Sequence, residues 1–465
     1  MTLTKKLVGD KAFYKMILGI ALPIMIQNGI TNFVSLLDNI MVGRLGTEQM
    51  SGVSIVNQFI FVFTLVLFGA VSGAGIFTAQ FFGKRDNVGV QSTFRFKLVS
   101  NLFLALLGIT VFILFDDNLI SLFLHDGESS GNLALTLEYG KNYLHIMLIG
   151  IFPFSVSMAY ASTMRETGDT VMPMLASIAG VATNTLLNWV LIFGFLGFPA
   201  LGVRGAAIAT VISRFVELSV LVIYAHTHTE RFPYLVGAFR AFSIPTALFF
   251  KIVKKALPIM ANEFFWSLAI TMRNQCYSVR GLDAVAAQNI SSTLVNLTNV
   301  VYMAIGSSIG IVVGKMLGAG EIKRAKDTAR KMIAFAVVMA LLMGILLSGA
   351  AFVFPMIYNT AESVKSLATY MMIISAIAMP FSAFAFSVYF TLRSGGQVLV
   401  TILFDSVFMW GFVIPISVVL AYFTSLPIYT LFAICQLIEF VKLGIGLLLV
   451  EKVNWARQLD VIAEG

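Results

Sequence analysis

The chain has 465 residues, of which 58% are hydrophobic and only 12% are charged. A soluble protein of this length would carry roughly 25% charged residues, so the composition excludes an ordinary soluble domain. The net charge of +8 does not indicate a nucleic-acid partner, because the basic residues gather in the loops between apolar segments.

Apolar stretches recur along the whole chain, and several exceed the roughly 20 residues that cross a bilayer as a helix. A transmembrane β-barrel would show short segments of alternating polarity instead. The pattern therefore predicts an all-α integral membrane protein with twelve transmembrane helices. In chain order these are expected at about 14–43, 50–82, 92–115, 135–161, 170–195, 203–226, 251–280, 285–317, 327–355, 361–392, 396–423 and 426–450.

Charge in the loops predicts the orientation of these helices. Basic residues precede the first helix and flank the 2–3, 6–7 and 8–9 loops, whereas the 3–4 loop is acidic. With twelve spans the basic positions share one side, and loops rich in Lys and Arg stay in the cytoplasm. We therefore expect a multi-pass protein of the cell inner (plasma) membrane with both termini cytoplasmic. The first basic group is Lys5, Lys6, Lys11 and Lys15, and the acidic group is Asp116, Asp117, Asp126 and Glu128.

The chain also repeats itself. The segment ALPIM occurs at 21–25 and again at 256–260, a shift of 235 residues that also pairs Gly83 with Gly318. A further echo pairs MRETGDT at 164–170 with LRSGGQV at 392–398. Repeats of six helices run in the same direction, so the two halves should be pseudo-symmetric lobes, which is a transporter architecture. The expected division is an N-lobe at 1–226, a cytoplasmic connector at 227–250 and a C-lobe at 251–465.

Two features of the repeat concern helix geometry. Pro23 and Pro258 occupy equivalent places inside the first helix of each half, where a proline frees a carbonyl and bends the helix. Each bend is either a fixed kink or a bend that changes during transport. The run GAVSGAG at 69–75 follows no strand, so it predicts close helix packing by small residues rather than a phosphate-binding loop.

The N-terminal half places ionisable and amide side chains inside the membrane. Asp38 lies near the end of the first helix, with no opposite charge within one helical turn. Asn184 and Asn188 lie one turn apart on the same face of the fifth helix, and the sixth helix contributes Thr210. Such oxygens suit Na⁺, and they equally suit a proton site, because burial favours the neutral acid. Polar packing between helices, worth about 1 kcal/mol per pair, is the structural alternative. It explains the amides but not Asp38.

The other candidates for a substrate cavity are Glu263, Asn57 and Asp405. Glu263 matches Asn28 of the first half, so the two halves present a charged and an uncharged version of one position. Its competing role is a local ion pair, with Arg273 or with a neighbouring helix. Two other pairs of charges lie three residues apart and are expected to bind one another. These are Arg214 with Glu217, and Glu439 with Lys442.

Enzyme functions find no support in the sequence. It carries neither a Walker A motif nor a cysteine-rich metal motif, and Cys276 and Cys435 both fall in apolar segments, as buried thiols do. We expect no enzyme activity, no cofactor and no nucleic-acid partner.

Over essentially its whole length the chain resembles the multidrug and toxic compound extrusion (MATE) transporters of prokaryotes. The resemblance rests on ALPIM followed by LLDNIMVGRLG, which contains Asp38, and on four later motifs in the same order. These are ETGDTVMPM, NTLLNWVLIFG, LGVRGAAIATVIS and LRSGGQ. The segment DNIMVGRLG is more similar to the DinF-like and archaeal-type branches than to the NorM branch.

The resemblance implies two six-helix lobes around a V-shaped cleft, and efflux of organic, often cationic, compounds in exchange for H⁺ or Na⁺. The family's ion-site aspartate, asparagine and threonine match Asp38, Asn184 and Thr210, which would also be the residues of any Na⁺ site. Asn188 stands where the family has a second carboxylate, and this departure favours H⁺. The family's helix 7 glutamate lies about one turn farther from Pro258 than Glu263 does.

We therefore expect a monomeric antiporter that works by alternating access and exports small organic cations. Two alternatives remain open at this stage. A flippase for lipid-linked oligosaccharides or cell-wall precursors shares the architecture, but it would usually show fourteen spans and an arginine-rich cavity. A membrane scaffold or receptor would not need titratable residues in the middle of a span.

Overall fold

The computed structural model describes residues 7–121, 132–240, 242–358 and 360–459, without the side chains of Leu36, Asn39, Thr47 and Leu282. Four charged residues on which the predicted orientation draws lie outside the described residues. They are Lys5, Lys6, Asp126 and Glu128.

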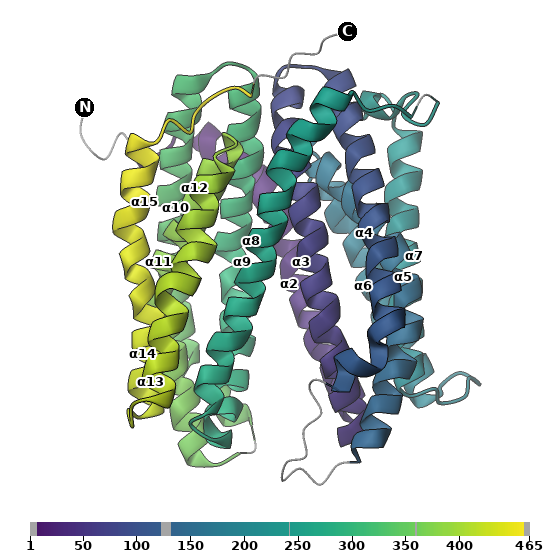
Figure 1. The fold of residues 1–465 in the computed structure, drawn as a ribbon, viewed down its shortest axis with the longest axis vertical. Coiled ribbons are helices and arrows are strands. Elements are labelled where there is room, and N and C mark those ends of the chain that lie inside the picture. The colour runs from purple at the N-terminus through teal and green to yellow at the C-terminus, as the bar shows by residue number, and fades with distance from the viewer. Residues whose placement is uncertain (1–6, 122–131, 241, 359, 460–465) are drawn as a thin grey trace. The chain divides into compact units, whose positions relative to one another are not determined.

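All twelve predicted helices are present in these ranges (Figure 1). The first ten are α2 (Lys11–Gly43), α3 (Thr47–Gly83), α4 (Asn87–Ser121), α5 (Leu133–Thr167), α6 (Val171–Phe193), α7 (Val203–Thr227), α8 (Thr246–Ser278), α9 (Leu282–Gly318), α10 (Ile322–Ala350) and α11 (Glu362–Ser394). The predicted all-α membrane fold is confirmed.

The last two predicted helices are interrupted by tighter or wider turns. The eleventh consists of α12 (Val398–Ile402), two π-helical turns η3 (Leu403–Val407) and η4 (Met409–Val413), and α13 (Ile414–Tyr422). The twelfth consists of α14 (Ile428–Leu437), the 3₁₀ turn η5 (Ile438–Phe440) and α15 (Val441–Lys452). Asp405 lies in η3 and Glu439 in η5, so each irregular turn carries a carboxylate.

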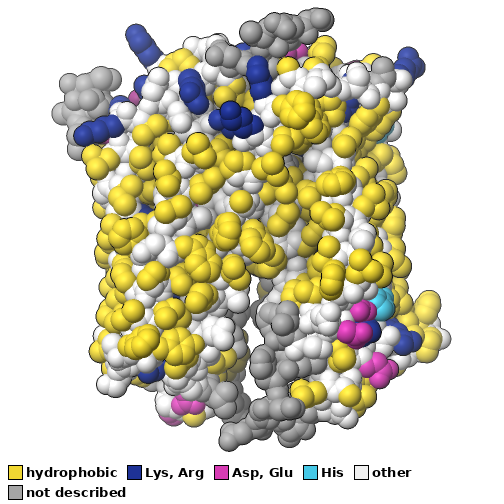
Figure 2. Space-filling model, viewed as in Figure 1, with side chains coloured by type: hydrophobic (Ala, Val, Ile, Leu, Met, Phe, Trp, Pro, Cys, Tyr) yellow, Lys and Arg dark blue, Asp and Glu magenta, His cyan; other side chains and the backbone are white. Residues whose placement is uncertain are grey.

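Eleven of these helices, counted over the described ranges, are long and apolar enough to cross a membrane. The exception is α8, which carries Lys251, Lys254, Lys255, Glu263 and Arg273. Figure 2 shows hydrophobic side chains along most of the visible length of the helices, with many of the visible Lys and Arg side chains near one end. That distribution suits helices surrounded by lipid along most of their length.

The chain forms two compact units. Unit 1 comprises residues 1–25, 79–86 and 261–465, and unit 2 comprises 26–78 and 87–260. The helices α2 and α8 therefore each contribute to both units. Both are divided directly after their ALPIM segment, two residues beyond Pro23 and Pro258. The expected division into lobes at residues 226 and 251 stays a prediction.

Each unit has its own apolar core. In unit 1, α9, α10 and α11 enclose the largest cluster of buried residues, which includes Ile309, Met332 and Val388. The N-terminal part of α2 joins it through Ile17 and Ala21. In unit 2, residues of α3, α4, α5 and α7 form the corresponding core.

The GAVSGAG run packs as the sequence predicts. Within unit 2, a side chain at Gly69 would overlap the backbone of Met260, and one at Gly73 would overlap Ala256. The glycines thus let α3 approach the ALPIM segment of α8 more closely than any larger residue would allow. The predicted role in helix packing is confirmed.

The segment between α7 and α8 is folded against α4 in unit 2. It contains the short 3₁₀ turn η1 (Pro233–Leu235), whose Tyr234 and Leu235 are buried. Gln91 and Arg95 of α4 together donate five hydrogen bonds of 2.7–3.2 Å to its backbone carbonyl groups. The acceptors are the carbonyls of Tyr234, Val236, Gly237, Ala238 and Ser243.

Candidate functional site

Unit 2 brings four of the predicted site residues together. Asp38 comes from α2, Asn184 and Asn188 from α6, and Thr210 from α7. The Asn188 amide donates to Asp38 Oδ1 at 2.7 Å. Asn188 is 1% exposed and Asn184 is 6% exposed, so the carboxylate faces amides that are shielded from water.

The Asn184 amide fits an ionised Asp38 in one of its two possible orientations, with its nitrogen toward the carboxylate. With its nitrogen toward Asp38, it donates to Oδ2 at 3.0 Å and to Oδ1 at 3.1 Å, and its oxygen accepts from the Thr210 hydroxyl at 3.1 Å. With its oxygen toward Asp38, it accepts from the Asn188 amide at 3.1 Å and donates to Thr210 at 3.1 Å.

The two orientations correspond to two charge states of Asp38. An ionised carboxylate only accepts hydrogen bonds, so it requires the Asn184 nitrogen. A protonated Asp38 has an O–H to donate and can face the Asn184 oxygen instead.

Charged and unsatisfied groups surround this cluster. On α7, Arg214 binds Glu217 at 3.1 Å, which confirms the pair predicted from their spacing. The positive charge of Arg214 also acts on Asp38. The Asn188 oxygen is buried and accepts no hydrogen bond from the described residues.

Asn57 does not join the Asp38 cluster through a hydrogen bond within the described residues. Its side-chain oxygen accepts a hydrogen bond from the Tyr143 hydroxyl at 3.2 Å, which links α3 to α5 in unit 2. Tyr143 itself is 5% exposed and belongs to the apolar core.

Glu263 and Asp405 belong to one polar network in unit 1. The Tyr389 hydroxyl donates to Glu263 Oε1 at 3.0 Å, and Arg393 lies 3.8 Å from the same oxygen. Asn262 donates to Asp405 Oδ2 at 3.2 Å, and Lys442 binds Asp405 Oδ1 at 3.2 Å. Asn262 also reaches the Tyr389 hydroxyl, at 3.5 Å, and so joins the two carboxylates.

One pairing expected from sequence spacing is wrong. Glu439 binds Arg273 at 3.0 Å rather than Lys442, and Lys442 binds Asp405. Spacing along one helix did not predict these contacts because the 3₁₀ turn at Glu439 and the π turn at Asp405 change which residues face each other. Of the two partners considered for Glu263, the structure shows the one on a neighbouring helix, Arg393 of α11, and not Arg273.

The sequence analysis also missed Asn262, Tyr389 and Arg393 as members of this network. One signal was available, because the echo of MRETGDT in LRSGGQV pairs Arg393 with Arg165. Arg165 contacts Gln27 of α2 at 3.4 Å, and Arg393 approaches Glu263 of α8. In both halves, an arginine near the end of the fourth repeat helix therefore meets a side chain of the first.

Twelve long helices in the described ranges, with carboxylates held by amides and cations inside each unit, define a polytopic helical membrane protein. The MatE family model matches residues 23–190 and 258–432, which together cover most of the chain. The chain belongs to the MatE family.

Curated relatives match nearly the full length. "Probable multidrug resistance protein NorM" of Thermotoga maritima is 25% identical over 419 residues, which cover 89% of this chain and 86% of that protein. "Probable multidrug resistance protein YoeA" of Bacillus subtilis is 24% identical over 413 residues, which cover 87% and 86%. The branch within the family is not resolved by these matches, since the NorM name recurs at comparable identity in several organisms.

Solved structures share the fold. One, described as the outward-facing conformation of a multidrug resistance MATE family transporter of the MOP superfamily, has a TM-score of 0.84 at 18% identity. It covers 97% of this chain and 98% of that chain. A MOP superfamily transporter from Pyrococcus furiosus has a TM-score of 0.80 at 19% identity, with coverage of 97% and 98%. Its structure is described as having a binding pocket of reverse polarity that suggests a different function.

Proposed function

We propose that the protein is a secondary active antiporter that exports organic cations from the cytoplasm in exchange for H⁺. Membership of the MatE family and the multidrug resistance names of its relatives support efflux of drug-like compounds. The observation that carries the proton is the Asp38 cluster, in which a single carboxyl group lies against buried asparagine amides that can bond to either its ionised or its neutral form.

The cluster holds a single carboxylate. Na⁺ binds through oxygen atoms, whereas Asp38 is faced by the Asn188 nitrogen and, when ionised, by the Asn184 nitrogen. Those N–H groups stabilise the ionised carboxylate directly, without a metal ion. Asn188 stands where the family's second carboxylate would add charge for Na⁺, so protonation is the favoured coupling step.

Coupling requires that proton and substrate prefer different states of the protein. Protonation of Asp38 removes its charge and reverses the Asn184 amide, which alters the packing of α2 against α6 and α7. We propose that this change bends α2 near Pro23, that Pro258 allows the equivalent change in α8, and that substrate is then released outward. Loss of the proton to the cytoplasm resets the cycle.

The network around Glu263 and Asp405 is the proposed place for substrate contact in unit 1. Its two carboxylates are balanced by Arg393 and Lys442, so the network as a whole carries no net charge. An organic cation that binds Glu263 must therefore compete with Arg393 for it. Glu263 is 13% exposed on its side chain and Arg393 only 4%, so the carboxylate is the more accessible partner.

Na⁺ coupling is the second candidate, and one observation favours it. The buried Asn188 oxygen has no hydrogen-bond partner among the described residues, and with the oxygens of Asp38 and Thr210 it could complete a Na⁺ site. The flippase alternative has no comparable support, because the described carboxylates of unit 1 already offset its buried cations.

Transport in proteoliposomes under imposed gradients tests the coupling ion. We expect uptake of a fluorescent organic cation driven by ΔpH at zero Na⁺, and no response to a Na⁺ gradient at fixed pH. Asn188→Asp adds the second charge and should introduce a response to Na⁺, while Thr183→Ser on the same helix serves as the control. Wild-type transport that follows Na⁺ and ignores ΔpH would overturn proton coupling.

The proposed contact between Glu263 and the substrate is tested in the same vesicles, by comparing transport of a charged and of a neutral compound. Glu263→Gln should reduce transport of a monovalent organic cation more than that of a neutral compound of similar size. Equal loss of both would contradict a role in substrate charge, and no loss of either would remove Glu263 from the site.

A further inference from the structure

The ends of α3 and α9 meet within unit 1 through two glycines. A side chain at Gly83 of α3 would overlap the carbonyl of Lys315 in α9. Reciprocally, a side chain at Gly318 of α9 would overlap the carbonyl of Gln80 in α3. The 235-residue shift relates the two glycines to each other, and it relates the two carbonyl-bearing residues in the same way. The contact is therefore symmetric with respect to the repeat, and it lies beside the 2–3 and 8–9 loops that charge predicts to be cytoplasmic.

The side chain of Gln80 also binds the C-terminal segment, which is defined here as residues 454–459. Gln80 is 2% exposed. Its amide nitrogen donates to the Ser394 carbonyl of α11 at 3.1 Å and to the Arg457 carbonyl at 3.4 Å. Its oxygen accepts a hydrogen bond from the Leu459 backbone N–H at 2.8 Å. The last described residues of the chain are therefore fastened to a helix of the first half.

The C-terminal segment is anchored to the second half independently of Gln80. Trp455 is 1% exposed and belongs to the largest apolar core of unit 1. Gly395, directly after α11, lies against the Trp455 carbonyl, which a side chain there would overlap. The Gln458 side chain donates to the Gly318 carbonyl of α9 at 3.0 Å. If the Gln80 hydrogen bonds break, the segment is still held by α9 and α11.

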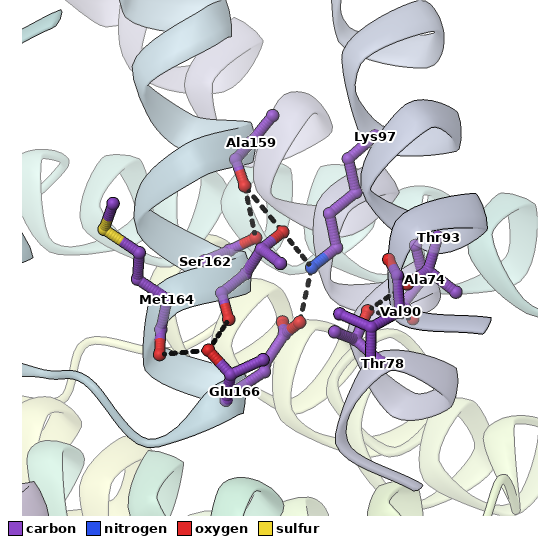
Figure 3. Close-up of polar contacts among 11 residues, drawn as sticks. Ala74, Thr78, Val90, Thr93, Lys97, Ala159, Ser162, Met164 and Glu166 are labelled. Atoms are coloured by element: carbon purple, nitrogen blue, oxygen red, sulfur yellow. Dashed lines mark hydrogen bonds and ion pairs between the residues drawn. The ribbon is translucent and has the colours of Figure 1, made fainter. Parts of the chain in front are cut away.

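Helix α3 connects this contact with unit 2, because it passes from unit 2 to unit 1 between residues 78 and 79. The buried hydroxyls of Thr78 and of Thr93 in α4 share a hydrogen bond of 2.9 Å (Figure 3). The same view shows Lys97 of α4 bound to Glu166 of α5. Since α3 is joined to α4 only two residues before Gln80, a movement of unit 2 that carries α3 with it acts directly on the Gln80 hydrogen bonds.

Capping of helix ends is the structural alternative for these contacts. The last carbonyl groups of a helix lack partners within it, and Gln458 supplies one for α9. Capping does not account for Gln80, because its oxygen receives the Leu459 N–H and so ties the segment to α3. The related position in the second half is Lys315, whose ammonium lies 4.7 Å from the centre of the Phe82 ring. The amide therefore occurs on one side of a contact that is otherwise symmetric.

We propose that the C-terminal segment is a latch, which holds the cytoplasmic end of α3 on α9 and must release Gln80 before the transporter opens toward the cytoplasm. The proposal rests on the proposed alternating-access function. While Gln80 is bound, the glycine contact between α3 and α9 stays closed. When its three hydrogen bonds break, α3 leaves with unit 2 and the segment remains on α9 and α11. The latch sets how often the protein opens inward, and it selects neither ion nor substrate.

Labelling of a buried cysteine measures how often the contact opens. Ala79→Cys is the reporter, because Ala79 is 2% exposed and lies against Gly314 of α9. It is reacted with N-ethylmaleimide in proteoliposomes, in a chain whose two native cysteines are replaced by alanine. Adding Gln80→Leu removes the three hydrogen bonds and should raise the labelling rate at least about tenfold. The control is Gln91→Leu, which removes two hydrogen bonds of 2.9 Å within unit 2 and should leave the rate unchanged.

Cross-linking tests whether transport requires the release of the segment. Gln80→Cys with Leu459→Cys is joined by a short bifunctional methanethiosulfonate, which dithiothreitol reverses. The cross-link should abolish exchange of labelled against unlabelled organic cation, and reduction should restore it. The matched pair is Gln397→Cys with Asn454→Cys, because the Gln397 side chain donates to the Asn454 carbonyl at 3.0 Å and both residues belong to the second half. Cross-linking that pair should leave exchange unchanged.

Two results would overturn the proposal. An unchanged labelling rate in Gln80→Leu would show that Gln80 does not keep the contact closed. Exchange that continues in fully cross-linked Gln80/Leu459 protein would show that the segment only caps α9 and α11. Failure of the proposed transport function is distinguishable, because wild-type protein would then exchange no organic cation while the labelling rates still report on the contact.

Discussion

At the scale of single residues, the spacing of polar side chains predicted the Asp38 cluster but not its internal geometry. Two asparagines four residues apart must share a helix face, and the structure brings both to Asp38 together with Thr210. The two orientations of the Asn184 amide depend on atoms from three helices. Contacts between side chains of different helices cannot be predicted from the spacing of residues within one helix. Tyr389 and Arg393 were not predicted beside Glu263 because they also lie on a different helix.

Replacing Asp38 by asparagine tests the switch directly. Asp38→Asn keeps the size of the side chain and removes its titration, so we expect ΔpH-driven efflux to fall to background. The amide can still bond to Asn184 and Asn188, so the melting temperature should change by no more than a few degrees, as for a loss of about 1 kcal/mol. Efflux and thermal stability are measured on the same purified preparations, with Asp117→Asn, which removes an exposed carboxylate of unit 2, as the control.

Full efflux by Asp38→Asn would remove Asp38 from the coupling step. Lost efflux accompanied by a large drop in melting temperature would instead favour a structural role in joining α2 to α6.

At the scale of helices, length and apolarity were sufficient to locate all twelve elements. Their ends differ by several residues from the predicted ones, because many helices continue beyond the apolar stretch as polar turns, as α4 does to Ser121. The π turns around Asp405 and the 3₁₀ turn at Glu439 were not predictable. Such irregular turns depend on neighbouring helices that satisfy the displaced backbone groups, and periodicity within one helix does not record those neighbours.

Close packing of α3 on α8 gives a prediction at this scale. Gly73→Ala adds a methyl group where Ala256 already lies, so we expect a loss of about 1–3 kcal/mol in stability. Gly444→Ala in α15 is the matched control, because nothing lies within 4 Å of the added carbon. There the loss of backbone freedom in the unfolded chain should instead stabilise the helix by about 0.5–1 kcal/mol.

Thermal unfolding in detergent, read by tryptophan fluorescence, measures both variants. A Gly73→Ala protein as stable as Gly444→Ala would mean that α3 and the ALPIM segment of α8 do not pack as closely as described.

At the scale of the whole molecule, the sequence repeat and the structure agree on two related halves that are not chemically equivalent. Lys97 with Glu166 in the first half corresponds to Met332 with Ser394 in the second, and Asn28 corresponds to Glu263. The helices also differ in polarity. Among the twelve long helices in the described ranges, eleven are apolar enough to be recognised as membrane spans, and α8 is the exception. Whether α8 crosses the membrane decides the orientation of everything that follows it.

The topology prediction follows from α8 as a twelfth span. Single cysteines at Lys84 in the 2–3 loop, Arg324 in the first turn of α10 beside the 8–9 loop, and Ser425 in the 11–12 loop are labelled in intact cells with a membrane-impermeant maleimide. With twelve spans and cytoplasmic termini, only Ser425→Cys should react before permeabilisation, while Lys84→Cys and Arg324→Cys should react only afterwards. If α8 does not cross, Arg324→Cys would react from outside and Ser425→Cys would not, with Lys84→Cys unchanged. Cys276 and Cys435 are buried and add little background, and their replacement by alanine provides the blank.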